Sequence, residues 1–268
     1  MINLSPSAIV RKQARITLKG NYVAAVAAFL ILLSPLFILE ALGTVIDMLL
    51  VQTVSDKQTL ELMEILILTP ICIAAVVLLS PLFNGYVRLF YQAAYTKKMN
   101  MNDVFYYFSA ERYQNTLHLN MLMIVRMIFP ALLCFLPLLA YYFICLRYME
   151  DFIGTVLYLD AAFLLTALSM ILLILYALKY YLVFTLYCED ETADVRQLIR
   201  TSKAMMKELK SSAAHLIFSF IPWMLLCLLI LPALYVIPYM TQSLCIGAKW
   251  MTMKGKQDES IAMYHRAQ

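Results

Sequence analysis

Five long stretches without a charged residue constrain the fold of this chain more than any other feature. They cover residues 20–39, 65–87, 127–146, 161–178 and 211–248, with His215 counted as neutral. A helix needs about 20 mostly apolar residues to cross the roughly 30 Å hydrocarbon core of a bilayer. Backbone groups cannot stay unpaired in hydrocarbon, so each stretch should be helical. The stretches therefore predict an all-α, polytopic transmembrane helical bundle.

The last of these stretches, residues 211–248, is too long for one ordinary span. As a single helix it would be about 57 Å long at 1.5 Å per residue, nearly twice the hydrocarbon thickness. It contains Pro222, Pro232 and Pro238, and proline inside a helix kinks or breaks it. A tight turn at Leu231-Pro232-Ala233 would give two short spans. One long kinked helix and two spans both stay open at this point.

The distribution of basic residues favours the version with two spans. Cytoplasmic loops are enriched in Lys and Arg. With six spans and the N-terminus inside, 19 of the 21 Lys and Arg residues lie on the cytoplasmic side, and only Lys57 and Arg147 lie outside. With five spans the ratio falls to 15 to 6. We therefore expect about six spans in three hairpins, with both termini in the cytoplasm.

Each predicted hairpin follows an amphipathic segment, which we expect to lie as an interfacial helix on the cytoplasmic side. The segments begin at Ser5-Pro6, near Asn102-Asp103 and near Thr192. In the third, the apolar face comprises Val195, Leu198, Ile199, Ser202, Met206 and Leu209. We interpret residues 1–268 as a single integral membrane domain with three repeats, at 5–98, 99–189 and 190–252. Residues 253–268 would form a polar cytoplasmic tail.

Four charged residues at or within the spans are candidate intramembrane functional residues, because charges in hydrocarbon are costly. They are Glu40, Arg126, Asp160 and Lys179. One interpretation is that they anchor helix ends at the interfaces, which long side chains can reach by snorkelling. The other is that Glu40 and Asp160 line an outward polar cavity with Arg147 as partner. Both interpretations stay open.

Basic and aromatic residues suggest contacts with lipid on the inner side. The third amphipathic segment carries four candidate contacts for anionic headgroups: Arg196, Arg200, Lys203 and Lys207. A tyrosine cluster near the same boundary is typical of an aromatic belt. It comprises Tyr86, Tyr91, Tyr95, Tyr106, Tyr107, Tyr180, Tyr181 and Tyr187.

Several short motifs resemble a known family. They are Leu18-Lys19-Gly20-Asn21-Tyr22, Ser80-Pro81-Leu82-Phe83-Asn84-Gly85-Tyr86, Tyr187-Cys188-Glu189-Asp190, Thr201-Ser202-Lys203-Ala204-Met205-Met206-Lys207 and Ile237-Pro238-Tyr239-Met240. Together they resemble a bacterial integral membrane family known only as domain of unknown function 975. Glu208 stands where members often carry glycine, and Ser211-Ser212-Ala213-Ala214 replaces a usual Lys-Trp. The family has no assigned activity, so the resemblance implies topology and a bacterial cell (inner) membrane only.

Catalytic signatures do not occur in the sequence. There is no phosphate-binding loop, H-E-x-x-H, G-x-S-x-G or Rossmann glycine pattern, and no C-x-x-C pair. We expect neither an enzyme nor a cofactor or metal site, and a net charge of +4 is too mild to suggest nucleic acid.

The leading hypothesis is a non-enzymatic accessory protein that engages membrane lipids, anionic ones included, or a membrane protein partner. The alternative is a small transporter or lipid carrier that uses its proline-broken spans. A hydrated cavity at the midplane would favour transport. An apolar groove open to lipid would favour lipid binding.

Overall fold

Helices account for all secondary structure in the part of the chain that the computed structural model describes, residues 6–53, 56–148, 152–227 and 229–266. The elements are α1 Pro6–Leu18, α2 Tyr22–Thr53, α3 Lys57–Thr96, η1 Met101–Phe108, α4 Ala110–Tyr148, α5 Phe152–Ala177, η2 Leu178–Tyr180, α6 Val183–Glu189, α7 Val195–Phe218, α8 Ile221–Leu226 and α9 Ile230–Arg266. Five segments of these residues are long and apolar enough to cross a membrane. The predicted all-α class is confirmed.

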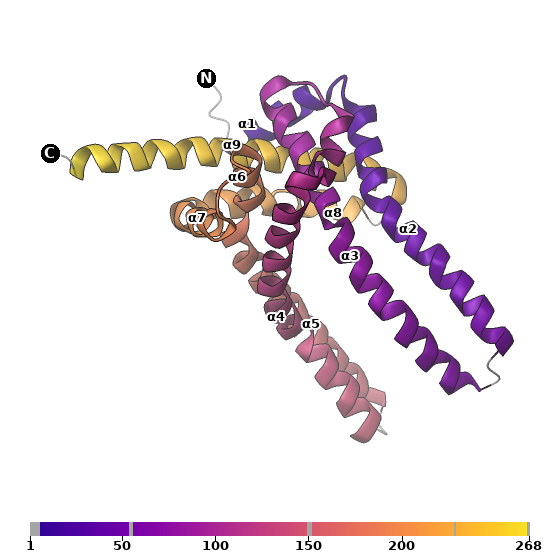
Figure 1. The fold of residues 1–268 in the computed structure, drawn as a ribbon. Helices are drawn as coiled ribbons and strands as arrows, with labels where there is room; N and C mark the ends of the chain where they lie inside the picture. Colours follow the sequence, from indigo (N-terminus) through magenta and orange to yellow (C-terminus); the bar gives the residue numbers. More distant parts are fainter. Residues whose placement is uncertain (1–5, 54–55, 149–151, 228, 267–268) are drawn as a thin grey trace.

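Two helical hairpins project from a common base and spread apart toward their tips (Figure 1). The first arm is the hairpin of α2 and α3, and the second is the hairpin of α4 and α5. Between the arms, α3 packs on α4, whereas α5 packs on neither helix of the first arm to any extent. The base comprises α1, η1, α6, α7 and the first part of α9, which crosses it and packs against α1, α3 and α7.

Burial is concentrated in the base. No residue of α3 before Pro81 is buried, whereas ten residues from Pro81 to Ala94 are. The large buried side chains, such as Phe90, Tyr187 and Phe220, belong to the base. The arms expose Leu, Ile and Phe along most of their length, and an apolar surface of this extent needs lipid or a partner around it.

The apolar stretch 211–248 breaks in two places. Helix α7 ends at Phe218, the short α8 ends at Leu226, and α9 begins at Ile230. The predicted turn at Leu231-Pro232-Ala233 is therefore a few residues too late. Pro232 lies in the first turn of α9, where its missing N–H breaks no helical hydrogen bond. The third hairpin, and with it the sixth span, stays a prediction.

The amphipathic segments begin close to where the sequence predicts. Helix α1 starts at Pro6, η1 at Met101 and α7 at Val195, where Asp194 caps the helix by accepting a hydrogen bond from the backbone N–H of Arg196. The six predicted inward residues of α7 are all buried. Their face packs against η2, α6 and α9, so it contributes to the protein core. The cytoplasmic location of these segments and the three repeats stay predictions.

The inner tyrosine cluster is mostly core, contrary to the interpretation as an aromatic belt. Tyr86, Tyr91, Tyr107, Tyr180 and Tyr187 are buried. Their hydroxyl groups find partners inside the base, as in the hydrogen bond of 2.9 Å between Tyr187 and Thr116. Buried tyrosines need such partners, and the sequence pattern does not distinguish them from interfacial ones.

Candidate functional site

A short chain of polar side chains joins the two arms where they leave the base. Asn84 Nδ2 of α3 donates to Asn120 Oδ1 of α4 at 2.9 Å. Asn120 Nδ2 in turn donates to Ser80 Oγ at 3.1 Å, and Ser80 Oγ donates to the carbonyl oxygen of Val77 at 2.7 Å. Both asparagines are buried. The chain of hydrogen bonds therefore holds α3 and α4 together in apolar surroundings.

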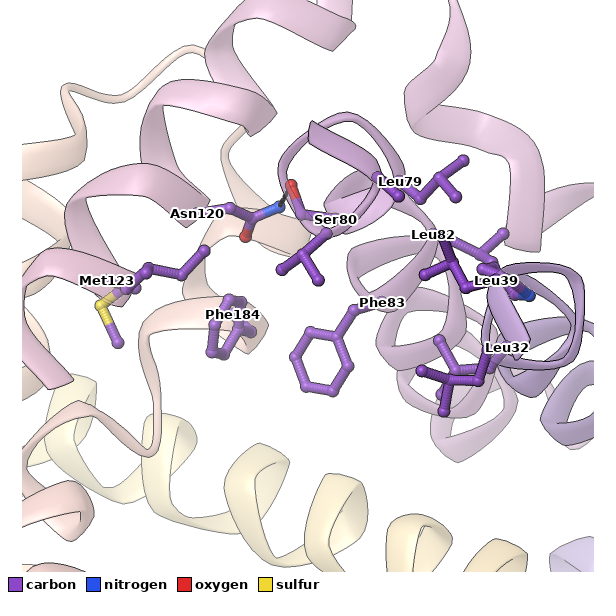
Figure 2. Close-up of a pocket in the computed structure, with 14 residues that line it drawn as sticks. Leu32, Leu39, Leu79, Ser80, Leu82, Phe83, Asn120, Met123 and Phe184 are labelled. Carbon is purple, nitrogen blue, oxygen red and sulfur yellow. Dashed lines mark hydrogen bonds between the residues drawn. The ribbon is translucent and has the colours of Figure 1, made fainter. Parts of the chain in front are cut away.

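An apolar pocket of about 360 Å³ opens beside this polar chain, between the two arms. We call it the inter-arm pocket. Its wall includes Leu32 and Leu39 of α2, Leu79 of α3, Met123 of α4 and Phe184 of α6. Figure 2 shows the polar side chains of Ser80 and Asn120 at one side of the pocket, above the Phe83 and Phe184 rings. These two residues supply the only polar side chains of its wall among the described residues.

A second, smaller cavity of about 230 Å³ lies behind the inter-arm pocket. Phe83 and Phe184 line both spaces. Their rings meet edge to face with centroids 5.2 Å apart, a favourable arrangement for two aromatic side chains. The second cavity also contacts Tyr86 and Thr241, whose hydroxyl oxygens are 3.3 Å apart. The aromatic pair thus contributes to the walls of both cavities.

An ion-pair network in the base joins both arms to the segment between α6 and α7. Glu191 Oε1 accepts from Arg88 Nη1 of α3 at 2.6 Å, and its Oε2 accepts from Arg112 Nε of α4 at 3.1 Å. The Arg88 guanidinium carbon lies 3.5 Å from the centre of the Tyr106 ring. The side chains of Arg88 and Glu191 are only 13% and 21% exposed. One carboxylate therefore connects the two arms at their base.

Helix η1 packs directly on the backbone of α3 at Gly85. A Cβ atom at this position would lie 1.9 Å from the carbonyl oxygen of Val104, so only glycine fits. Burial raises the pKa of Asp103 in η1, and the guanidinium of Arg88, 3.8 Å away, opposes this shift. Burial also raises the pKa of Tyr107, which keeps its hydroxyl protonated as a donor to Cys188 Sγ at 3.6 Å.

The predicted intramembrane charges do not form one site. Glu40 is exposed on α2, and Asp160 is exposed on α5 in the other arm. The side chain of Arg147, their suggested partner, lies outside the described part. Arg126 is half-buried on α4 without an ion-pair partner among the described residues. Lys179 is exposed, with its Nζ 4.8 Å from the centre of the Tyr176 ring.

The four basic candidates of α7 are exposed together, opposite its buried face. They are Arg196, Arg200, Lys203 and Lys207. Lys203 Nζ also lies 5.1 Å from the centre of the Tyr180 ring. The face is therefore accessible to anions, and its binding of lipid headgroups stays a prediction.

Sequence reasoning did not select the residues that the fold brings together most closely. Asn84 and Asn120 had one usable signal, since an amide inside an apolar helix is costly unless it is paired. The Glu191 network had none, because its partners come from helices about 80 and 100 positions earlier in the chain.

Fold and surface together define a class of protein. Five apolar helical segments, two of them forming an arm with hardly a buried residue beyond the base, indicate a multi-pass helical membrane protein. The chain belongs to the family described as "Protein of unknown function (DUF975)", whose model matches residues 4–246. No curated protein and no solved structure matches the chain.

Proposed function

We propose that this protein is a non-enzymatic lipid-binding protein of the bacterial cell membrane, which takes an acyl chain of a membrane lipid into the inter-arm pocket. The observation that carries the proposal is the pocket itself. It is walled by Leu, Met and Phe side chains, and it opens between two arms whose own surfaces are apolar. A lipid chain is the apolar ligand that surrounds such arms in a bilayer.

The transport alternative has less support. A polar cavity of about 550 Å³ lies in the first arm. Its wall includes the carboxylates of Glu40, Asp47 and Glu64. All three carboxylates come from the first arm, on α2 and α3. A transporter binding site is instead typically built where two halves of the chain face each other near the midplane. The inter-arm pocket, which does lie between the two arms, is apolar, and this favours lipid binding.

We further propose that the base lies on the cytoplasmic side with both termini. The arm tips hold Lys57 and Arg147, the two basic residues that the charge count leaves outside, while the remaining 19 belong to the base or its surroundings. This count supports an even number of crossings. The arms supply four, and residues 211–248 supply two more in the six-span version.

A cysteine at position 229 tests the number of crossings. Leu229 is exposed and lies between α8 and α9. In a cysteine-free background, Leu229→Cys should react with a membrane-impermeant thiol reagent added outside intact cells if the chain crosses six times. Protection outside, with labelling only after the cells are opened, would mean four crossings. A cysteine in place of Lys57, at a proposed outer tip, is the control.

Lipid that co-purifies with the protein tests the binding proposal. The full chain is purified in mild detergent, and its bound lipids are counted and identified by native mass spectrometry. Leu79→Trp should fill the pocket and lower lipid occupancy about fivefold or more, a change of about 1 kcal/mol. Leu66→Trp, on the exposed surface of the same helix, should leave occupancy unchanged. Equal occupancy in both variants and the native chain would overturn the proposal.

A further inference from the structure

We infer that the inter-arm pocket recognises an ester-linked acyl chain, whose carbonyl oxygen accepts a hydrogen bond from the side-chain amide of Asn120. This inference rests on the proposed lipid binding and specifies its ligand. The ligand class is a glycerolipid with ester bonds, as opposed to a hydrocarbon or an ether-linked lipid.

Among the members of the polar chain that line the pocket, Ser80 and Asn120, one donor is left for a ligand. Asn120 Nδ2 carries two hydrogens, and among the described residues only Ser80 Oγ accepts one of them. Ser80 itself gives its proton to the carbonyl oxygen of Val77, so it has no proton left to offer. Among the described residues of the pocket wall, the unshared N–H of Asn120 is therefore the one side-chain donor that is left.

Burial makes this spare donor significant. Asn120 is only 5% exposed, and Figure 2 shows its side chain at the pocket with Met123 and Phe184 on the same side of the view. A buried N–H group that lacks an acceptor is unfavourable. A hydrocarbon chain cannot satisfy it. An ester carbonyl can, because it is an acceptor that brings no donor of its own needing a partner.

The depth of Ser80 and Asn120 in the membrane agrees with the depth of a lipid ester group. Ser80 lies within the uncharged stretch 65–87 of α3, whereas Asn120 lies shortly before the uncharged stretch 127–146 of α4. The pair thus lies near the edge of the apolar region. In a bilayer this edge is where the apolar chains meet the polar headgroup region. From there the chain can extend along Leu79 toward Leu39, both of which line the pocket.

Two lipids that differ only in having an ester or an ether bond to the hydrocarbon chain test the inference. Ester-linked and ether-linked phosphatidylglycerol of equal chain length compete for the delipidated full chain, and native mass spectrometry measures the bound ratio. The native protein should prefer the ester about fivefold, which is about 1 kcal/mol. Equal binding of the two lipids by the native protein would overturn the inference without any variant.

Substitutions test whether Asn120 is the residue that causes the preference for the ester-linked lipid. Asn120→Leu should bind both lipids and lose the preference, whereas Ser80→Ala, which keeps the amide donor, should retain it. Gln242→Leu is the matched control, because Gln242 is a buried amide of α9 that does not line the pocket. Persistence of the preference in Asn120→Leu would also contradict the inference.

The outcomes separate this inference from the proposed function. If Leu79→Trp lowers the binding of both lipids while the native chain treats them alike, the pocket stands and carbonyl recognition is wrong. If Leu79→Trp leaves both lipids bound, the proposed site itself is wrong.

Discussion

Helix α3 passes through two different environments, and the contrast divides the whole molecule. In the first arm, residues 57–80 contain no buried side chain, whereas from Pro81 onward the same helix is packed on several sides. The base is held by protein contacts, and the arms present their surface to whatever surrounds them. Folding specificity therefore comes from the base, while the arms depend on a lipid environment.

The same contrast holds for charged pairs. Lys57 and Glu61 pair at 3.9 Å in the arm with side chains 89% and 60% exposed. Arg88 and Glu191 pair at 2.6 Å in the base and are largely enclosed. Exposed pairs contribute little, whereas breaking an enclosed pair leaves an uncompensated charge. A substitution in the base should therefore lower stability more than a matching substitution in the arm.

Alanine substitutions at two helical glycines should give the largest difference in stability between base and arm. Gly85→Ala in the base places a Cβ atom 1.9 Å from a backbone oxygen of η1, which forces η1 away from α3. We expect a loss of about 3 kcal/mol, at the upper end for overpacking. In Gly43→Ala of the arm, the added Cβ atom lies at ordinary contact distances of 3.7 and 3.9 Å from the two Cδ atoms of Leu68. The substitution should therefore be neutral or stabilising by up to about 1 kcal/mol.

Thermal or denaturant unfolding in detergent, followed by the fluorescence of Trp223 and Trp250, measures this comparison. Both tryptophans lie in helices that pack on the base. Equal stability of the two alanine variants would mean that the packing of η1 on α3 does not hold the base together.

Substitution of Glu191 should give the second-largest difference in stability between base and arm. Glu191→Gln leaves Asp103, 3.8 Å away, as the remaining counter-charge of the enclosed Arg88 and weakens the hold on Arg112. We expect a loss of about 2 kcal/mol, below the full range for buried pairs because both arginines retain some solvent access. Glu61→Gln in the arm should change stability by less than about 0.5 kcal/mol. The same unfolding assay applies, and a large effect of Glu61→Gln would show that the arm is structured by its own charges.

Much of the arm architecture could be predicted from the sequence, because span length and hydrophobicity follow directly from the bilayer. The uncharged stretch 20–39 lies within α2 from Tyr22 onward, and the stretch 65–87 lies within α3. The buried face of α7 follows from its helical periodicity. The base could be predicted less well. The break before α9 depends on how residues 219–227 pack, and Pro232 alone indicated the wrong position for it.

The candidate site shows the same limit. Glu40, Arg126, Asp160 and Lys179 were selected because a charge in a span is conspicuous, yet they lie apart. Asn120 and Glu191 gain their importance from partners brought by other helices, as when Glu191 meets arginines from both arms. Such pairing depends on tertiary structure, which a single sequence does not reveal by composition or periodicity.

Asp103 makes the stability of the base sensitive to pH. Its pKa is raised, mainly by burial. The stability that its protonated form contributes is therefore complete below the ordinary pKa of an aspartate and is lost as the pH rises through the raised value. Relative to the native chain, Asp103→Asn should gain stability between pH 4 and pH 7, by less than Glu191→Gln loses.

Unfolding temperatures of the two proteins across this pH range measure the effect. A constant difference between Asp103→Asn and the native chain would contradict it. Asp160→Asn is the control for replacing a carboxylate by an amide at an exposed position of the arm.

The smallest change in stability is expected at Glu40, the first of the four charged candidates selected from the sequence. Glu40 is exposed beside Asp47 and Glu64, so Glu40→Gln removes no buried charge and no ion pair among the described residues. Stability should change by less than about 0.5 kcal/mol, and the bound lipid should stay as in the native chain. If Glu40→Gln abolished a cellular phenotype while expression and lipid occupancy stayed normal, the polar cavity of the first arm would have a role of its own. The arms would then be more than a lipid-exposed support for the pocket at their base.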